Sequence, residues 1–161
     1  MMPQQSQEEP RRTAQRTYRD RAWRSIMETH GAIVPILDSE LLAKAGIDIQ
    51  TYDALLHVFE AREQGIRMAD LASAVVISKS GITSLVDRLE ASSLVRRNLD
   101  PDDRRATRIT LTATGEATFR AAAQVHLAGI EEHFASRISD EEALGIAETL
   151  ERVCRHDETP S

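Results

Sequence analysis

Apolar residues recur at steps of three or four through most of this chain, which is the spacing of amphipathic helices. The segment "TYDALLHVFEA" is typical, with Tyr52, Leu55 and Phe59 on one face. The shorter "MADLASAV", beginning at Met68, and the longer "KSGITSLVDRLEASSL", beginning at Lys79, follow the same rule. We expect the longer segment to bury Ile82, Leu85, Val86 and Leu89. The pattern predicts a mainly α-helical chain.

The period changes between Val95 and Leu111, where polar and apolar residues alternate as in a half-buried strand. "VRRNL" and the residues from Arg108 onward can pair across the loop "DPDDRRA", which predicts a β-hairpin. Thr112 is placed to cap a long helix that follows. The "SDEE" segment at Ser139 matches a capping box and predicts the start of a last helix.

The two ends of the chain differ from the middle. Residues 1–15 are polar and proline-containing, which predicts a disordered tail, and residues 156–161 predict a second one. Helical periodicity begins at about residue 16, and Pro35 should kink or break that helix. Gly46 fits a C-terminal cap, and Asp48 can cap the next helix.

A short helix, a turn, a second helix and a hairpin follow one another in the order of a winged helix-turn-helix. The fold class that we predict is therefore mainly α with a small β-hairpin wing, a minor α+β component. Residues 48–112 form the winged domain, and residues 16–46 and 113–155 form helical regions for dimerisation. In the last helix we expect Leu144, Ala147, Leu150 and Cys154 to be buried.

Charge is unevenly distributed along the chain. The total is −6, but from Ser78 to Thr110 seven basic side chains outnumber five acidic ones, so this segment carries +2 and the remainder −8. Because the local sign of the charge decides where a polyanion binds, the negative total charge does not exclude binding to nucleic acid.

The chain lacks an apolar signal core and a membrane-length apolar run, so we expect a cytoplasmic protein. Its one cysteine excludes an intrachain disulfide.

The helix beginning near Ser78 has a second face that its own core does not use. Small side chains let a helix enter the major groove, and hydroxyls reach base edges or phosphates. The DNA-binding candidates on this helix are Ser78, Lys79, Ser80, Thr83, Ser84 and Arg88. The alternative interpretation of the same face is a solvated helix surface.

The predicted hairpin loop carries Arg104 and Arg105. Arginine is the residue that enters the narrow, electronegative minor groove, and a hairpin is long enough to carry it there. Asp103 can pair with an arginine and fix its direction. The alternative is a charged loop that is only solvated.

At these residues the chain resembles the MarR family of bacterial transcriptional regulators. "ISKSGITSLVDRLEASSLV" is similar to that family's recognition helix, and "DPDDRRATRITLTATG" is similar to its wing. The resemblance covers roughly residues 20 to 155. It implies a homodimer, a palindromic DNA site and regulation of nearby genes, with Arg104 as the wing-tip minor-groove residue and Asp103 as its orienting partner.

Apolar stripes along both terminal helical regions also favour a dimer, because stripes without a partner would be exposed patches. The alternative is that these helices close a monomeric bundle. A two-fold dimer would place its recognition helices one DNA turn apart, about 34–36 Å.

The resemblance also implies release of DNA when a small aromatic or phenolic acid enters a cleft between the dimerisation and winged regions. Candidates to line this cleft are Trp23, Met27, His30, Tyr52 and His57, for which core and dimer packing is the alternative.

We expect no catalysis, because no nucleophile elbow, phosphate loop or metal-ligand pair is present. We also expect no metal or cofactor, and we leave open a sensing role for a histidine or Cys154.

The function predicted from sequence is a sequence-specific DNA-binding repressor that acts as a homodimer. The competing function is that of a helical adaptor that binds only protein.

Overall fold

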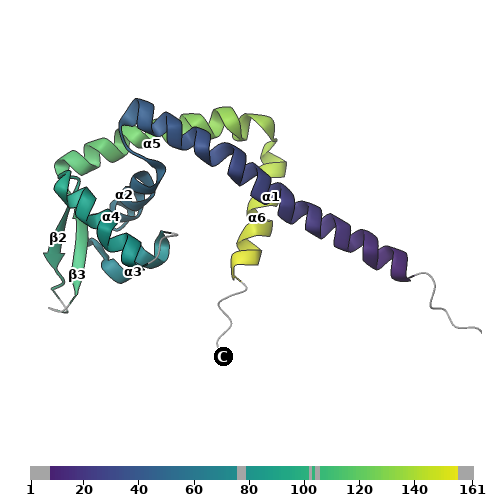
Figure 1. Ribbon diagram of the computed structural model, residues 1–161, viewed down its shortest axis with the longest axis horizontal. Coiled ribbons are helices and arrows are strands. Elements are labelled where there is room, and N and C mark those ends of the chain that lie inside the picture. The colour runs from purple at the N-terminus through teal and green to yellow at the C-terminus, as the bar shows by residue number, and fades with distance from the viewer. Residues whose placement is uncertain (1–7, 76–78, 102, 104–105, 156–161) are drawn as a thin grey trace, which may run out of the picture. The chain divides into compact units, whose positions relative to one another are not determined.

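The computed structural model describes residues 8–75, 79–101, 103 and 106–155 (Figure 1). The described residues form six α-helices, two short 3₁₀ helices and one three-stranded sheet. This confirms the predicted fold class, mainly α with a small β wing. The chain divides into two compact units between Ile36 and Leu37. The predicted domain ranges, 16–46 and 113–155 for dimerisation and 48–112 for the winged domain, stay predictions.

Helix α1, Glu8–Ala45, corrects two predictions about the start of the chain. Residues 8–15 are helical, whereas we expected a tail through residue 15. Pro10 is tolerated because it lies in the first turn, where the missing amide hydrogen would have no partner. The helix also runs through Pro35, so the predicted break is wrong, whereas the alternative, a kink, stays a prediction. One proline removes a single backbone hydrogen bond, and the turns on either side keep theirs.

Helix α2, Ile49–Glu60, begins where the sequence predicts. Gly46 has φ of 72°, the left-handed conformation that ends α1. Asp48 then caps α2 by accepting a hydrogen bond of 2.7 Å from the amide of Thr51. A second carboxylate, from Asp38 in α1, accepts from the first amide of α2 at 2.7 Å. These two carboxylates fix the angle between the end of α1 and α2.

A short strand that the sequence did not predict follows α2. The 3₁₀ helix η1, Arg62–Gln64, leads into β1, Ile66–Arg67, where we had expected only a turn. Two residues are too few for an alternating pattern to be recognised. The predicted short helix is confirmed as α3, Met68–Ala74.

Helix α4, Lys79–Ala91, ends in a left-handed residue that is not glycine. Ser93 has φ of 57°, and the amides of Ser93 and Leu94 donate to the carbonyls of Glu90 and Leu89. This pair of hydrogen bonds is the Schellman arrangement of a helix C-terminus. It turns the chain directly into the sheet.

The predicted hairpin is present, formed by β2, Val95–Leu99, and β3, Thr107–Leu111. The two strands are antiparallel, with Arg97 opposite Ile109 and Leu99 opposite Thr107. β1 pairs with the other edge of β3, so the sheet order is β1-β3-β2. In Figure 1 the hairpin lies beside α4 and extends away from the start of α5.

Helix α5, Ala113–His133, is capped by Thr112 as predicted. The Thr112 hydroxyl accepts from the amide of Gly115 at 2.9 Å and donates to the carbonyl of Ser93 at 2.6 Å. Gly115 lies against the turn after α4, where a Cβ atom would be 1.8 Å from the carbonyl oxygen of Leu94. The start of α5 is therefore held by the same turn that starts the wing.

Helix α6, Asp140–Cys154, follows the 3₁₀ helix η2, Ala135–Arg137. The predicted capping box is present, with Ser139 and Glu142 bonded reciprocally. We predicted that the apolar side chains of α6 are buried, and in the single chain this prediction is wrong. Its apolar side chains are exposed, Leu144 by 60% and Leu150 by 37%, and Cys154 is exposed too.

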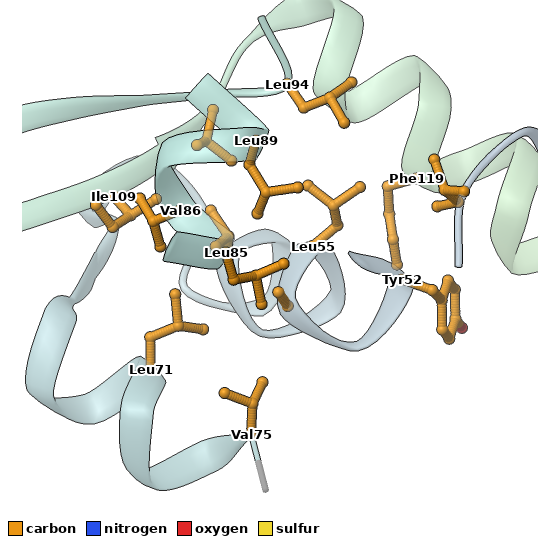
Figure 2. Packing of buried hydrophobic residues seen from close by; sticks show 14 of the residues in the cluster. Tyr52, Leu55, Leu71, Val75, Leu85, Val86, Leu89, Leu94, Ile109 and Phe119 are labelled. Atoms are coloured by element: carbon orange, nitrogen blue, oxygen red, sulfur yellow. The ribbon is translucent and has the colours of Figure 1, made fainter. Parts of the chain in front are cut away.

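One hydrophobic core lies in the unit that begins at Leu37 (Figure 2). The predicted face of α4 is fully inside it, with each of the four side chains at most 3% exposed. Leu55 of α2, Leu71 of α3 and Ile109 of β3 meet that face, and none of them is exposed. Leu41 from the end of α1 joins the same core. Within the described residues no helix is long and apolar enough to cross a membrane.

The close approach at Gly115 predicts a stability difference between two glycines. Gly115→Ala should lower the free energy of unfolding by about 1–3 kcal/mol, because the backbone of Leu94 must move. Gly145→Ala in α6 is the matched control, since nothing lies within 4 Å of its added methyl. Gly145→Ala should leave the stability unchanged or raise it by up to about 1 kcal/mol. Urea unfolding measures both, and equal stabilities would contradict the packing.

Partly buried His126 predicts a dependence of stability on pH. Its ring lies 4.4 Å from that of Tyr52, and its Nδ1 atom is buried without a hydrogen-bond partner among the described residues. Burial lowers the pKa of His126, and the nearby Asp53 opposes this shift only in part. Below the usual histidine pKa of about 6.5 the unfolded chain therefore binds more protons than the folded chain does. As a result, the free energy of unfolding falls as the pH falls.

The measurement is the urea unfolding free energy of the parent and of His126→Phe between about pH 7 and pH 5. The parent should lose more stability than the variant over this window. The exposed His30→Gln variant serves as the control and should follow the parent. Parallel pH profiles for the parent and His126→Phe would contradict the assignment.

Candidate DNA-binding surface

Helix α4 divides its side chains between the core and solvent as the sequence predicts. Thr83, Ser84 and Arg88 are all exposed on the face opposite the buried leucines. Among the described residues Arg88 has no ion-pair partner. The outer face of α4 therefore offers two hydroxyls and a cation to a ligand in solution.

Other predicted contacts fall at or beyond the limits of the described structure. Ser78, Arg104 and Arg105 lie outside the described residues. Lys79 and Ser80 form the first turn of α4, and their side chains are not described. The roles predicted for these five residues stay predictions.

Arg97 of β2 fastens the wing to α4. Its guanidinium donates to the carboxylate of Asp87 at 2.6 Å and also binds that of Glu90. Its backbone amide donates to Glu90 as well, at 3.2 Å. These bonds keep the pKa of Arg97 above its ordinary value despite partial burial. Two acids of the recognition helix are thus used to hold the wing, which sequence reasoning did not foresee.

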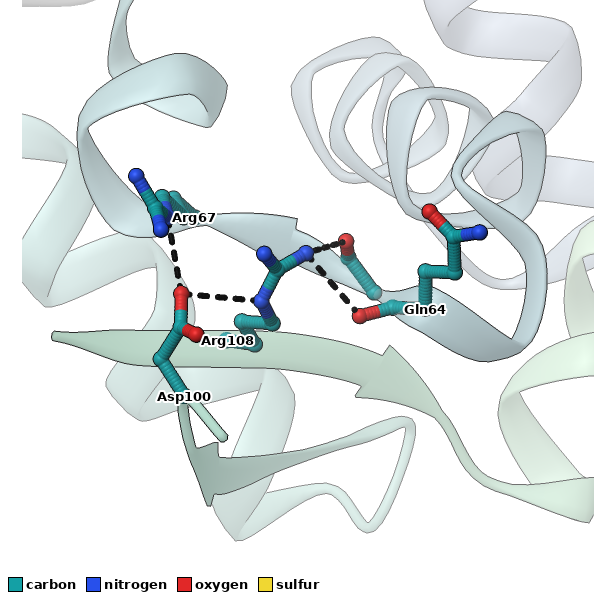
Figure 3. A network of polar contacts seen from close by, with 5 residues as sticks. Gln64, Arg67, Asp100 and Arg108 are labelled. Atoms are coloured by element: carbon teal, nitrogen blue, oxygen red, sulfur yellow. Dashed lines mark hydrogen bonds and ion pairs between the residues drawn. The ribbon is translucent and has the colours of Figure 1, made fainter. Parts of the chain in front are cut away.

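A buried carboxylate joins the three strands (Figure 3). Asp100, just after β2, is 1% exposed, and its Oδ2 accepts from Arg67 Nε at 2.7 Å and Arg108 Nε at 2.9 Å. Arg108 also donates to the carbonyls of Gln64 and Gly65, each at 3.3 Å. The hydrogen bond that Arg67 donates to Asp100 raises the pKa of Arg67. Arg67 comes from β1 and Arg108 from β3, so one carboxylate connects strands far apart in sequence.

The turn at the end of the wing is closed by backbone bonds. The amide of Asp100 donates to the carbonyl of Ala106 at 3.0 Å, and the amide of Ala106 donates to that of Asp103 at 2.9 Å. The Asp103 side chain is exposed, and its charge contributes to the raised pKa of Arg67. Its predicted partner Arg104 lies outside the described residues, so the orienting role of Asp103 stays a prediction.

The residues predicted to line an effector cleft belong to both compact units. In the first unit Trp23 is 65% exposed, Met27 is 50% exposed and His30 is exposed. In the second, Tyr52 is buried in the core, with its ring stacked 5.8 Å from that of Phe119. His57 is half-buried and lies 3.7 Å from carboxylate oxygens of its neighbours on α2. Core packing already accounts for Tyr52.

A groove of about 470 Å³ lies between the end of α2, the outer face of the hairpin and the start of α5. Phe59 forms part of its lining, and the guanidinium of Arg120 lies 5.1 Å above the Phe59 ring. Arg62 and Arg96 line it as well. None of the residues predicted to bind an effector is among its lining residues.

Comparison with known proteins gives the same architecture. A model of the MarR family matches residues 45–106. The crystal structure of AbsC, a MarR family transcriptional regulator from Streptomyces coelicolor, is 30% identical with a TM-score of 0.79. The similarity covers 85% of this chain and 92% of AbsC. This chain belongs to the MarR family. Members of the family are DNA-binding transcriptional regulators, not enzymes.

Two further MarR family structures are similar. Sco3205 from Streptomyces coelicolor, solved in complex with DNA, is 28% identical with a TM-score of 0.79, covering 88% of this chain and 92% of that one. CouR from Rhodococcus jostii RHA1, solved with p-coumaroyl-CoA, is 26% identical with a TM-score of 0.72, covering 80% and 87%.

Curated sequences agree over a shorter stretch. The transcriptional regulator HosA from Escherichia coli O111:H- is 37% identical over 82 residues, which are 51% of this chain and 60% of HosA. The chain thus matches about three fifths of the length of HosA.

The buried carboxylate predicts a difference between two aspartates. Asp100→Asn should lower the free energy of unfolding by about 2–3 kcal/mol, because two arginines lose a charged acceptor. This loss is smaller than that expected for breaking a fully buried ion pair, since Arg67 stays partly in water. Asp87→Asn removes an exposed ion pair with Arg97 and should cost less than about 1 kcal/mol. Urea unfolding distinguishes them, and equal losses would show that Asp100 does not anchor the sheet.

Proposed function

We propose that this MarR family protein is a sequence-specific transcriptional repressor. It binds a palindromic operator as a homodimer, with α4 in the major groove and the arginines of the wing in the adjacent minor groove. A small aromatic or phenolic ligand releases it from DNA.

The observation that carries the proposal is the outer face of α4. It exposes Thr83, Ser84 and Arg88 while the opposite face is fully buried. Hydroxyls and arginine are side chains that reach base edges and phosphates from a helix in the major groove. The DNA complex of the similar protein Sco3205 supports the assignment.

Exposed apolar side chains support the homodimer. In α6, Leu144 and Val153 are 60% and 64% exposed, and Leu150 is 37% exposed. In α1, Trp23 and Met27 are 65% and 50% exposed. Large apolar side chains left exposed on a helix favour an interface with a partner. A second copy related by two-fold symmetry would present the same surface and read the second half of a palindrome.

The ligand is proposed by analogy with CouR, which was solved with p-coumaroyl-CoA. Trp23, Met27, His30, Tyr52 and His57 stay the candidates to line its cleft. Of these, Tyr52 has the least free surface, because its ring is stacked in the core.

The direct experiment is selection of genomic DNA fragments by the purified protein, followed by sequencing. We expect the retained fragments to share a palindrome whose half-sites are one helical turn apart, about 10 base pairs. Affinity for that duplex should fall steeply with salt, because each neutralised phosphate releases counterions. Absence of salt-dependent retention would contradict the proposal and favour a protein-binding adaptor.

The wing predicts a residue-specific loss of affinity. Arg104→Ala should weaken binding to the selected duplex by about 1–3 kcal/mol, or roughly five- to 150-fold, because a groove contact is lost. Arg155→Ala is the control, since this exposed arginine ends α6 and pairs only with Glu151 among the described residues. Fluorescence anisotropy gives the affinities, and sedimentation confirms that both variants stay dimeric. If Arg104→Ala bound like Arg155→Ala, the wing would not be the minor-groove element.

A further inference from the structure

Two helices bring three metal-ligating side chains together away from the DNA-binding surface. Glu40 comes from the last turns of α1, and Glu132 and His133 come from the end of α5. One ligand atom from each lies within 4.8 Å of the others. The sequence does not show this cluster, because Glu40 is 93 residues away from His133.

The packing of the two helices holds this cluster in place. His133 Nε2 lies 2.8 Å from Glu40 Oε1, and both side chains are only about one fifth exposed. Gly129, one turn earlier in α5, is close enough to α1 that an added Cβ would be 3.3 Å from Glu40 Oε2. The carboxylate of Glu40 is therefore held in contact with α5 and is not a freely moving surface side chain.

The charges of the cluster suit a divalent cation. His133 Nε2 faces one carboxylate oxygen of Glu40, and Lys44 Nζ faces the other. Lys44 Nζ lies 3.2 Å from Glu40 Oε2 and occupies the position of a counter-cation. An imidazole with two carboxylates is a ligand set that zinc accepts, with water in the fourth position.

We propose that Glu40, Glu132 and His133 bind one zinc ion per chain. The imidazole gives up its contact with Glu40 Oε1, and the ion takes the place between the two groups. Lys44 competes with the ion for Glu40. The bound ion connects the end of α1 to the end of α5. The proposal of this zinc site does not depend on the proposed DNA-binding function.

The test is zinc titration of the full-length, chelator-treated protein by calorimetry, with cobalt absorption as a second readout of coordination. Parent protein should bind one zinc ion per chain. Glu132→Gln should weaken binding by at least about tenfold, since one ligand of three is lost. Glu131→Gln is the matched control, because this neighbouring acid is outside the cluster, and it should bind like the parent. Lys44→Ala should bind zinc more tightly than the parent.

Two results would overturn the proposal. One is a parent protein that takes up no zinc at micromolar concentration. The other is zinc binding that Glu132→Gln and Glu131→Gln affect equally, which would place the metal elsewhere, for example at the C-terminal cysteine and histidine. Glu132 is exposed, so its replacement tests ligation without disturbing the core.

Discussion

The wing of this protein depends on one buried carboxylate. Asp100 has almost no access to water, and it is stabilised there because two guanidinium groups donate to the same oxygen. A buried charge without such partners would be strongly unfavourable. Because Arg67 and Arg108 belong to β1 and β3, the interaction makes a three-stranded sheet from a hairpin and a two-residue strand. A hairpin alone is marginally stable in water, so this third strand and its ion pairs give the wing its fixed shape.

A second set of contacts makes the wing and the recognition helix one unit. Arg97 binds two acids on α4, and the turn at Ser93 and Leu94 connects α4 to β2 and supports the start of α5. The exposed face of α4 therefore keeps its orientation relative to the hairpin. The proposed binding, with α4 in a major groove and the wing in the adjacent minor groove, would require such rigidity, since separate movement of the two elements would lose the register between them.

The sequence predicted the elements that depend on local pattern. The buried face of α4, the hairpin and the caps at Asp48, Thr112 and Ser139 were all foreseen, because each needs only residues close in the chain. It did not predict β1 or the role of Asp100, since both depend on partners more than thirty residues away, as the Arg67–Asp100 separation of 33 shows. Residues 8–15 were expected to be disordered because they have almost nothing to bury, but they continue the helix that follows them.

The central claim is that α4 and the wing together form the surface that contacts DNA. The most direct measurement is an NMR titration of isotope-labelled protein with a duplex selected from the genome, following each backbone amide. The account predicts that the largest shifts occur at Thr83, Ser84 and Arg88 and in the wing loop, while amides of α6 change little. Large shifts confined to α6, with the amides of α4 unchanged, would contradict it.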